Sequence, residues 1–208
     1  MVKEAVFAVP GELATPTGGY AYDRRIIAEL AALGWRIDGG RPRRRISVSH
    51  DAYARAAARA RLAALPAGPP IVIDGLAFGA LPDAAEALRA SHPLVALVHH
   101  PLALETGLSA TASALLRASE RTALGCARHV IATSTATARL LAADYDVATD
   151  RLSVVEPGTE RVASRPRKPG SVIALLAVGC GRPAQGLRCA GRGAREAQAS
   201  AVAARHRR

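Results

Sequence analysis

Residues 6–30, VFAVPGELATPTGGYAYDRRIIAEL, decide the fold of this chain. The apolar run Val6 to Val9 predicts a short buried strand, which Pro10 and Gly11 end. From Tyr20 onward, apolar side chains recur at the spacing of one helix face. A strand, a glycine turn and a helix in this order bring unpaired backbone N–H groups and the positive end of a helix dipole to one point, which attracts phosphate.

The glycine pair in the loop, Gly18 and Gly19, has two interpretations. Without a Cβ atom, the two residues let a ligand approach the backbone closely. The alternative is a plain strand-to-helix connection, because a lone glycine pair is a weak motif. The rest of the chain has to decide between them.

The composition permits one large domain, or one domain with a fragment of another. Half of the 208 residues are hydrophobic but only 3% are aromatic, so Leu, Val, Ile and Ala must fill the core. No apolar run is long enough to span a membrane, and the N-terminus has no signal-peptide pattern. Cys126, Cys180 and Cys189 show no metal-ligand spacing, and their odd number argues against a disulfide framework. We therefore expect a cytoplasmic protein.

The net charge of +11 is concentrated at one end of the chain. Residues 1–160 hold 17 Lys and Arg against 16 Asp and Glu, whereas residues 161–208 hold 11 Lys and Arg against the single acid Glu196. The folded part is thus close to neutral and the C-terminal part carries the charge. A smaller basic run, Pro42 to Arg45, predicts a solvated loop or a contact with an anionic lipid or an acidic substrate.

Short apolar runs without alternation recur along the chain, and most are followed by a helical pattern. Such runs indicate a parallel sheet that is covered by helices on both faces. The fold class that we expect is therefore α/β, with a doubly wound, mostly parallel sheet of about six strand–helix units. The expected strands after the first are 35–38, 71–75, 93–98, 129–133 and 152–156, and the expected later helices are 51–65, 84–90, 109–125 and 136–143.

The loops that follow parallel strands open on one edge of the sheet, where ligands bind. His99 and His100 come directly after a buried strand, and an imidazole there can donate to a sugar hydroxyl or assist a developing charge. We expect His100 to do this and His99 to cap the strand. Asp74 either binds a hydroxyl or caps the next segment, and Glu105 is a polar partner for the histidines or a solvated loop acid.

Several nucleotide-binding and hydrolase classes lack their motifs in this chain. No Gly-x-Gly-x-x-Gly follows the first strand, which disfavours a nicotinamide-cofactor oxidoreductase. No Gly-Lys-Ser/Thr phosphate loop is present, which disfavours an ATPase, and the serines lack a nucleophile elbow.

Four segments occur in the order of a known family and together cover about residues 4–180. They resemble the N-terminal half of retaining glycosyltransferases of the group 1 (family 4) type, which have the GT-B fold. The segments are 15–20 (TPTGGY), 98–101 (VHHP), 130–134 (VIATS) and 152–160 (LSVVEPGTE), the last being similar to the hinge of the family.

The resemblance implies a two-domain enzyme that transfers a sugar from a nucleotide-diphosphate sugar to a sugar, lipid or polysaccharide-precursor acceptor. Gly18 and Gly19 would face the donor phosphates, and His100, with His99 beside it, would lie near the transferred sugar. Tyr20, Asp74 and Glu105 would contact the acceptor or the sugar. The resemblance implies no metal and no cofactor, because basic side chains of a C-terminal domain and helix N-termini stabilise the leaving diphosphate. Peripheral contact with the inner face of the membrane is compatible with a lipid acceptor, and no specific nucleic acid is expected.

The chain departs from the family after an apolar segment that ends at Gly179. The basic phosphate clamp and the paired-glutamate motif that grip the donor are absent from the sequence. We therefore expect residues 1–160 to form the acceptor-side domain, 161–180 to form the hinge and the first strand of a missing donor domain, and 181–208 to be a basic tail. On this interpretation the chain as given is truncated and inactive.

The basic tail itself, residues 181–208, has two interpretations. Back-translated with suitably chosen codons of a GC-rich gene and read one base later, it can spell AAPRKGYDVLVAALAKLKRLPWRLAI, a loop, a helix and a strand that suit the family; this predicts a frameshift near Cys180. The alternative is a disordered tail that binds nucleic acid or an anionic membrane, which would make the protein a non-catalytic binding module.

Overall fold

A computed structural model describes residues 3–37, 46–47, 52–65 and 67–159 of the chain. The predicted basic loop 42–45, the segment 161–180, the tail 181–208, Cys180 and Cys189 lie outside the described residues. Cys126 is buried, and its thiol donates to Glu86 at 3.1 Å.

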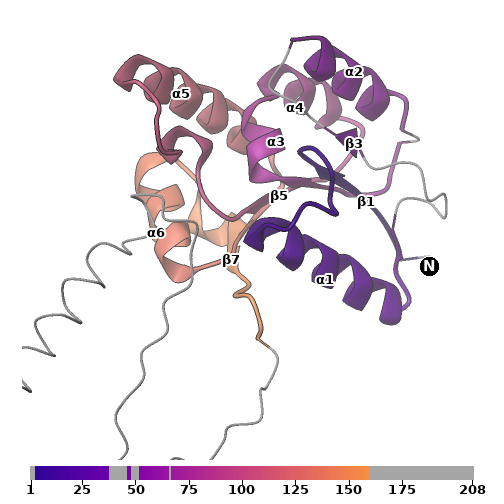
Figure 1. Cartoon of the computed structure of the whole chain (residues 1–208). Coiled ribbons are helices and arrows are strands. Elements are labelled where there is room, and N and C mark those ends of the chain that lie inside the picture. The colour runs from indigo at the N-terminus through magenta and orange to yellow at the C-terminus, as the bar shows by residue number, and fades with distance from the viewer. Residues whose placement is uncertain (1–2, 38–45, 48–51, 66, 160–208) are drawn as a thin grey trace, which may run out of the picture. The chain divides into compact units, whose positions relative to one another are not determined.

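The described elements mostly alternate between strands and helices, as the sequence predicts, except that β3 follows β2 and α4 follows α3 (Figure 1). In chain order they are β1 (Glu4–Val9), α1 (Gly18–Ala32), β2 (Arg36–Ile37), β3 (Ile46–Ser47), α2 (Ala52–Ala63), β4 (Ile71–Asp74), α3 (Gly75–Gly79), α4 (Pro82–Leu88), β5 (Leu94–Val98), the 3₁₀-helix η2 (Leu102–Leu104), α5 (Ala110–Cys126), β6 (His129–Ala132), α6 (Thr135–Asp144), the 3₁₀-helix η3 (Thr149–Arg151) and β7 (Leu152–Val154).

The strands form one sheet, in the order β2-β1-β4-β5-β6-β7, and β3 also pairs with β1. Every described strand pair is parallel, which confirms the α/β fold with a parallel sheet. Val6 of β1 lies opposite Ile71 of β4, and Ile71 lies opposite Leu94 of β5, so the strands that carry the apolar runs occupy the centre.

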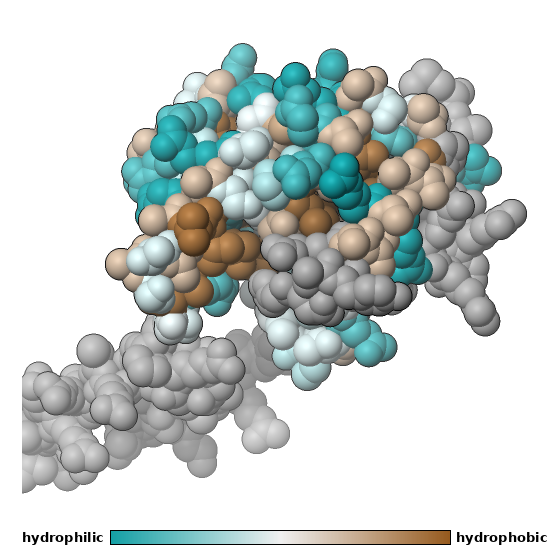
Figure 2. Space-filling model, turned by 90° about the horizontal axis from the view of Figure 1, so that it is seen from above, coloured by the Kyte–Doolittle hydropathy of each residue, from teal (hydrophilic) through white to brown (hydrophobic). Residues whose placement is uncertain are grey.

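Two apolar clusters cover the two faces of the sheet, as a doubly wound fold requires. The larger joins Ala8, Ile73 and Ala96 of the sheet to residues of α2 through α6. The smaller joins Phe7, Val9 and Leu97 to α1. Figure 1 shows α1 on one side of the sheet and α2, α4 and α5 on the other. Seen from the side of α2, α4 and α5, the surface is mostly hydrophilic with separate hydrophobic patches (Figure 2).

Besides the 3₁₀-helices η2 and η3, one α-helix and one strand were not expected from the sequence. Helix α3 shows no helical pattern in the sequence because it has only five residues and begins and ends with glycine. Its first turn is capped by the Asp74 side chain, which accepts from Leu76 N at 2.8 Å. Strand β3 has two residues, too few for a period of two to appear.

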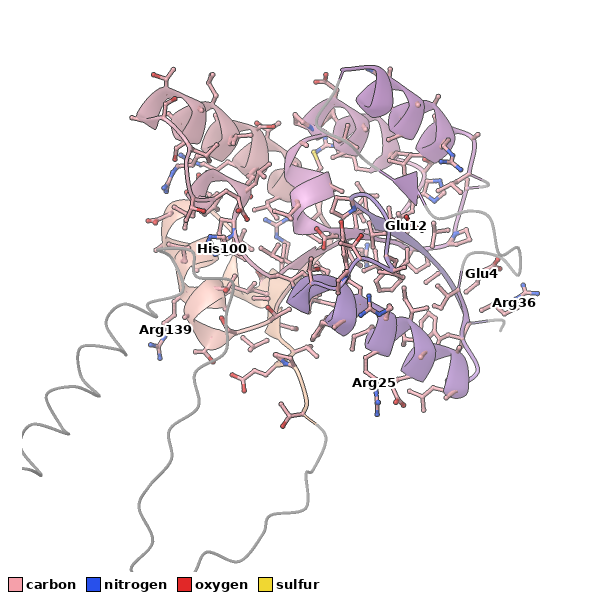
Figure 3. All side chains as sticks on the ribbon, in the orientation of Figure 1. Glu4, Glu12, Arg25, Arg36, His100 and Arg139 are labelled. Atoms are coloured by element: carbon pink, nitrogen blue, oxygen red, sulfur yellow. The ribbon has the colours of Figure 1, made fainter. Side chains whose placement is uncertain are left out.

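Because all described strands are parallel, they all begin at one end of the sheet and finish at the other. We call these two ends the amino edge and the carboxyl edge. Glu4 and Arg36 begin β1 and β2 and form an ion pair of 3.0 Å at the amino edge. Figure 3 shows these two residues far along the sheet from His100, which follows β5 at the carboxyl edge. Among the described helices, none has both the length and the apolar character to cross a membrane.

Candidate functional site

The carboxyl edge of the sheet begins with the loop between β1 and α1. Thr17 is the N-cap of α1, and its hydroxyl accepts from Tyr20 N at 3.2 Å. The Arg24 guanidinium donates to the carbonyls of Leu13 and Thr15, which fixes the loop against its own helix. Among the described residues, the N–H groups of Gly18 and Gly19 have no hydrogen-bond acceptor, so they remain available at the helix N-terminus.

His99, the first residue after β5, lies between two buried carboxylates from two other elements. Its Nε2 lies 3.1 Å from Oδ1 of Asp23 on α1 and 3.7 Å from Oδ2 of Asp74 at the end of β4. The Asp23 and Asp74 side chains are 0% and 3% exposed, whereas His99 is 21% exposed and so connects the cluster to the surface. We call these three residues the Asp–His–Asp cluster.

Three further contacts hold His99 in place, two at its ring and one at its backbone carbonyl. The Tyr22 ring meets it edge-on, with centroids 5.2 Å apart and an angle of 83°. Gly19 also packs against the ring, since a Cβ added at Gly19 would lie 3.3 Å from His99 Cδ2. The Thr137 hydroxyl on α6 donates to the His99 carbonyl at 3.4 Å. A bulkier residue at position 19 would therefore disturb the histidine as well as the loop.

The charges of the Asp–His–Asp cluster influence one another. Burial raises the pKa of Asp74 to about 6, and the charge of Asp23 adds to the rise. Burial would lower the pKa of His99, but its hydrogen bond to Asp23 and the charges of Asp23 and Asp74 outweigh this and raise that pKa. Protonated His99 is thus favoured by the two carboxylates around it.

Asp74 performs one of the two tasks that the sequence left open. Its Oδ1 accepts from Leu76 N, so it does cap the next segment. Its Oδ2 is the atom that faces His99. A hydroxyl contact by Asp74 stays a prediction.

His100 and Glu105 lie in the loop after β5. The Nε2–H of His100 donates to the Leu104 carbonyl at 3.2 Å, and Glu105 follows η2 as an exposed side chain. The preference for His100 over His99 as the residue that assists at the sugar also stays a prediction.

A cavity of about 260 Å³ lies at this edge of the sheet. It brings together six of the seven site residues predicted from the sequence and leaves out Gly18, whose neighbourhood is open. The lining residues are Thr17, Gly19, Tyr20, Asp74, Leu76, His99, His100 and Glu105. Hydroxyl-binding groups, an aromatic ring and free N–H groups at a helix N-terminus suit a polar ligand that carries hydroxyls and phosphate.

Two acids of this region were missed from the sequence, and both carried a signal. Asp23 follows Tyr20 and precedes Ile27 and Leu30 on the apolar face of α1, so an ionisable residue occupies a core position. Glu120 likewise occupies a buried position of α5, among the apolar residues of that helix, and is only 4% exposed. An acid at a core position of an amphipathic helix is unfavourable unless it is paired, which makes it a candidate functional or structural residue.

Glu120 supports the loop that carries His100. Its two oxygens accept from Leu102 N at 2.5 Å and Ala103 N at 2.9 Å. Burial raises the pKa of Glu120, although these two hydrogen bonds oppose the rise. Burial likewise raises the pKa of the neighbouring Tyr145 to about 12, with a further contribution from the charge of Glu120.

Comparison of the sequence with known protein families shows to which family the chain is similar. The family described as Glycosyltransferase Family 4 matches residues 12–161, which is more than half of the chain. The match includes the glycine loop, both histidines and the segment after β7. No curated protein matches the chain.

Proposed function

The chain belongs to glycosyltransferase family 4, and we propose that residues 1–160 form the acceptor-side domain of a retaining sugar transferase that uses a nucleotide-diphosphate sugar. The observation that carries this proposal is the cavity at the carboxyl edge of the sheet, where a helix N-terminus with free N–H groups lies beside two histidines and Asp74. Donor phosphate and sugar hydroxyls are the groups that such a set of side chains and N–H groups would bind.

The N-terminus of α1 is assigned to phosphate. The N–H groups of Gly18 and Gly19 point out of the first turn, and the helix dipole adds a partial positive charge there. These groups stabilise negative charge as it develops on the leaving diphosphate, which lowers the barrier to transfer. No acidic residue lies in the first turn of α1 to weaken this effect.

The histidines and acids are assigned to the sugar and the acceptor. His100 and His99 donate to hydroxyls of the transferred sugar, and Asp74 and Glu105 accept from hydroxyls of the sugar or the acceptor. The Tyr20 ring offers a flat apolar surface to a sugar ring. Tyr22 and Asp23 keep the His99 ring in one orientation, so the donor arrives at a preformed site.

Binding is tested by saturation-transfer NMR of nucleotide-diphosphate sugars and simple sugars added to the 208-residue chain. We expect saturation of the phosphate-linked sugar protons, and loss of binding by at least about tenfold in Gly19→Val, whose side chain would displace His99. Gly125→Val is the matched control, because Gly125 is also helical but open. Equal binding by Gly19→Val and the control would contradict the assignment.

Turnover is a separate question from binding. The paired-glutamate motif that grips the donor is absent from the sequence, so we expect the 208-residue chain to bind its substrates without releasing nucleoside diphosphate above background. Robust release of nucleoside diphosphate with any nucleotide sugar would contradict the expected inactivity and leave the assignment of the site intact.

The charge of residues 161–208 favours a second candidate function, a binding module that docks on nucleic acid or an anionic membrane. Salt-dependent binding to DNA or to phosphatidylserine vesicles that disappears when residues 181–208 are removed would support it. Binding of both ligands that is unchanged by the deletion would exclude it.

A further inference from the structure

We propose that Asp23, Asp74 and His99 form a binding site for one divalent transition metal ion, of the Zn²⁺ or Mn²⁺ type. The ion is separate from the chemistry at the leaving diphosphate, for which the resemblance implies no metal. It would lie on the inner wall of the cavity and join α1 to the ends of β4 and β5. Two of its ligands, Asp74 and His99, are residues that the proposed function places at the sugar or the acceptor, but the proposal does not depend on which sugar or acceptor the domain binds.

The spacing of the ligand atoms fits a single ion. One atom from each of the three side chains can be chosen so that all lie within 4.8 Å of one another. His99 Nε2 lies 3.1 Å and 3.7 Å from the nearest carboxylate oxygens of Asp23 and Asp74. Nitrogen and oxygen atoms bound to one Zn²⁺ at about 2.0–2.2 Å are roughly 3.0–3.5 Å apart, so small side-chain movements complete the site.

A buried carboxylate oxygen without a hydrogen-bond partner supports a cation site at this position. Asp23 Oδ2 is buried and accepts no hydrogen bond from any described residue. Among the described residues, only His99 lies within ion-pair distance of Asp23 or Asp74, so two buried carboxylates share one imidazole. A buried charge without full compensation is costly, and a divalent ion would neutralise both carboxylates while the imidazole binds it in its neutral form.

The surroundings of the three ligands are those of a metal site with an open position. Asp74 is oriented by Leu76 N through its other oxygen, and the His99 ring by Tyr22, and such outer contacts are what orient metal ligands. His99 borders the cavity of about 260 Å³, which provides a path for entry. Three protein ligands leave at least one coordination position for water or for a hydroxyl of a bound ligand.

The test is a titration of the EDTA-treated 208-residue chain with Zn²⁺, Mn²⁺ and Co²⁺, followed by calorimetry and thermal denaturation. We expect one ion per chain and a higher melting temperature than that of the metal-free chain. The absorption spectrum of the Co²⁺ form should be typical of coordination by nitrogen and oxygen ligands. Asp23→Asn and His99→Gln should weaken binding by at least about tenfold. Asp83→Asn, which removes the same charge from an exposed position on α4, should bind as the parent chain does.

Two results would overturn the proposal. One is the absence of binding at one ion per chain to the parent protein, which would leave His99 as an imidazolium between the carboxylates. The other is metal binding that Asp23→Asn and His99→Gln do not weaken, which would place the ion on other histidines. If Asp23→Asn does not fold, His99→Gln and the Co²⁺ spectrum of the parent chain still decide. Sugar binding measured in EDTA tests the proposed function independently.

Discussion

Helices α1 and α5 each place one acid among their apolar side chains, but the two acids are satisfied differently. Both oxygens of Glu120 on α5 accept backbone N–H groups, from Leu102 and Ala103. Asp23 on α1 contacts His99 through one oxygen, and its other oxygen is buried without a hydrogen bond. Among the described residues, the fold therefore provides hydrogen-bond partners for both oxygens of Glu120 but for only one oxygen of Asp23.

This difference separates a structural acid from one available to a ligand. Glu120 fixes the backbone of η2 and therefore the loop on which His100 and Glu105 are placed. Asp23 fixes His99 at the wall of the cavity and retains the capacity for one more interaction. Truncating Glu120 should thus harm folding, and changing Asp23 should mainly harm binding.

The largest effect is expected for Glu120→Ala. The substitution leaves the N–H groups of Leu102 and Ala103 buried without an acceptor, which we expect to lower the free energy of unfolding by about 3 kcal/mol. Urea denaturation followed by circular dichroism measures this value. Glu105→Ala, at an exposed position in the same loop, should change it by less than about 0.5 kcal/mol. Equal losses of unfolding free energy in both variants would contradict the structural role of Glu120.

The next effect is expected at Gly79, the residue of α3 that faces Glu120. A Cβ at Gly79 would lie 2.5 Å from Glu120 Cγ, so Gly79→Ala forces the carboxylate away from its partners. We expect a loss of about 2 kcal/mol by the same urea measurement. Gly125→Ala is the control, because nothing lies near that helical position and alanine favours helix there. A stabilised Gly79→Ala would show that Glu120 is not held in place.

Two amide substitutions compare the acids directly. In Glu120→Gln, the side-chain NH₂ faces a backbone N–H, so we expect a loss of about 2 kcal/mol. In Asp23→Asn, the amide oxygen still accepts from His99 and one buried charge is removed, so we expect a change within about 1 kcal/mol. The comparison fails if Asp23→Asn destabilises the protein as much as Glu120→Gln does.

The smallest effect is a pH dependence of stability that arises from Glu120. Because burial raises the folded-state pKa of Glu120, the folded chain binds the proton more tightly than the unfolded chain. The associated stability is fully present below the ordinary carboxyl pKa of about 4.5 and is lost as pH rises through the folded-state pKa. The nearby charge of His100 opposes the shift, and Tyr145 is the other titratable group in contact.

This pH effect is measured as the difference between the melting temperatures of the parent chain and Glu120→Gln from pH 4 to pH 7. The parent chain should lose stability relative to the variant as pH rises. If the melting temperature of the parent chain instead rises relative to that of the variant as pH increases, the backbone hydrogen bonds lower the pKa of Glu120 by more than burial raises it.

The sequence contains enough information to predict which residues meet at the candidate site, but not to rank them. Unalternating apolar runs predicted the parallel sheet, and parallel strands alone bring Asp74, His99 and Gly19 to one edge. Strand order and contact distances are not visible in local patterns, so the sequence did not reveal that His99 lies between two carboxylates. Asp23 occupies an apolar position of the helix period of α1. An acid at an apolar position of that period is itself a signal.

The most direct test of the proposed ligand site is a ¹⁵N NMR titration of the chain with a nucleotide-diphosphate sugar, with backbone assignments. We predict that the amide signals of Gly18, Gly19 and Tyr20 and those of the His99–His100 loop shift together, while Gly125 on the far part of α5 and Arg36 at the amino edge do not. Shifts confined to the amino edge or to residues 161–208, or no shifts at saturating ligand, would contradict a ligand site at the carboxyl edge of the sheet.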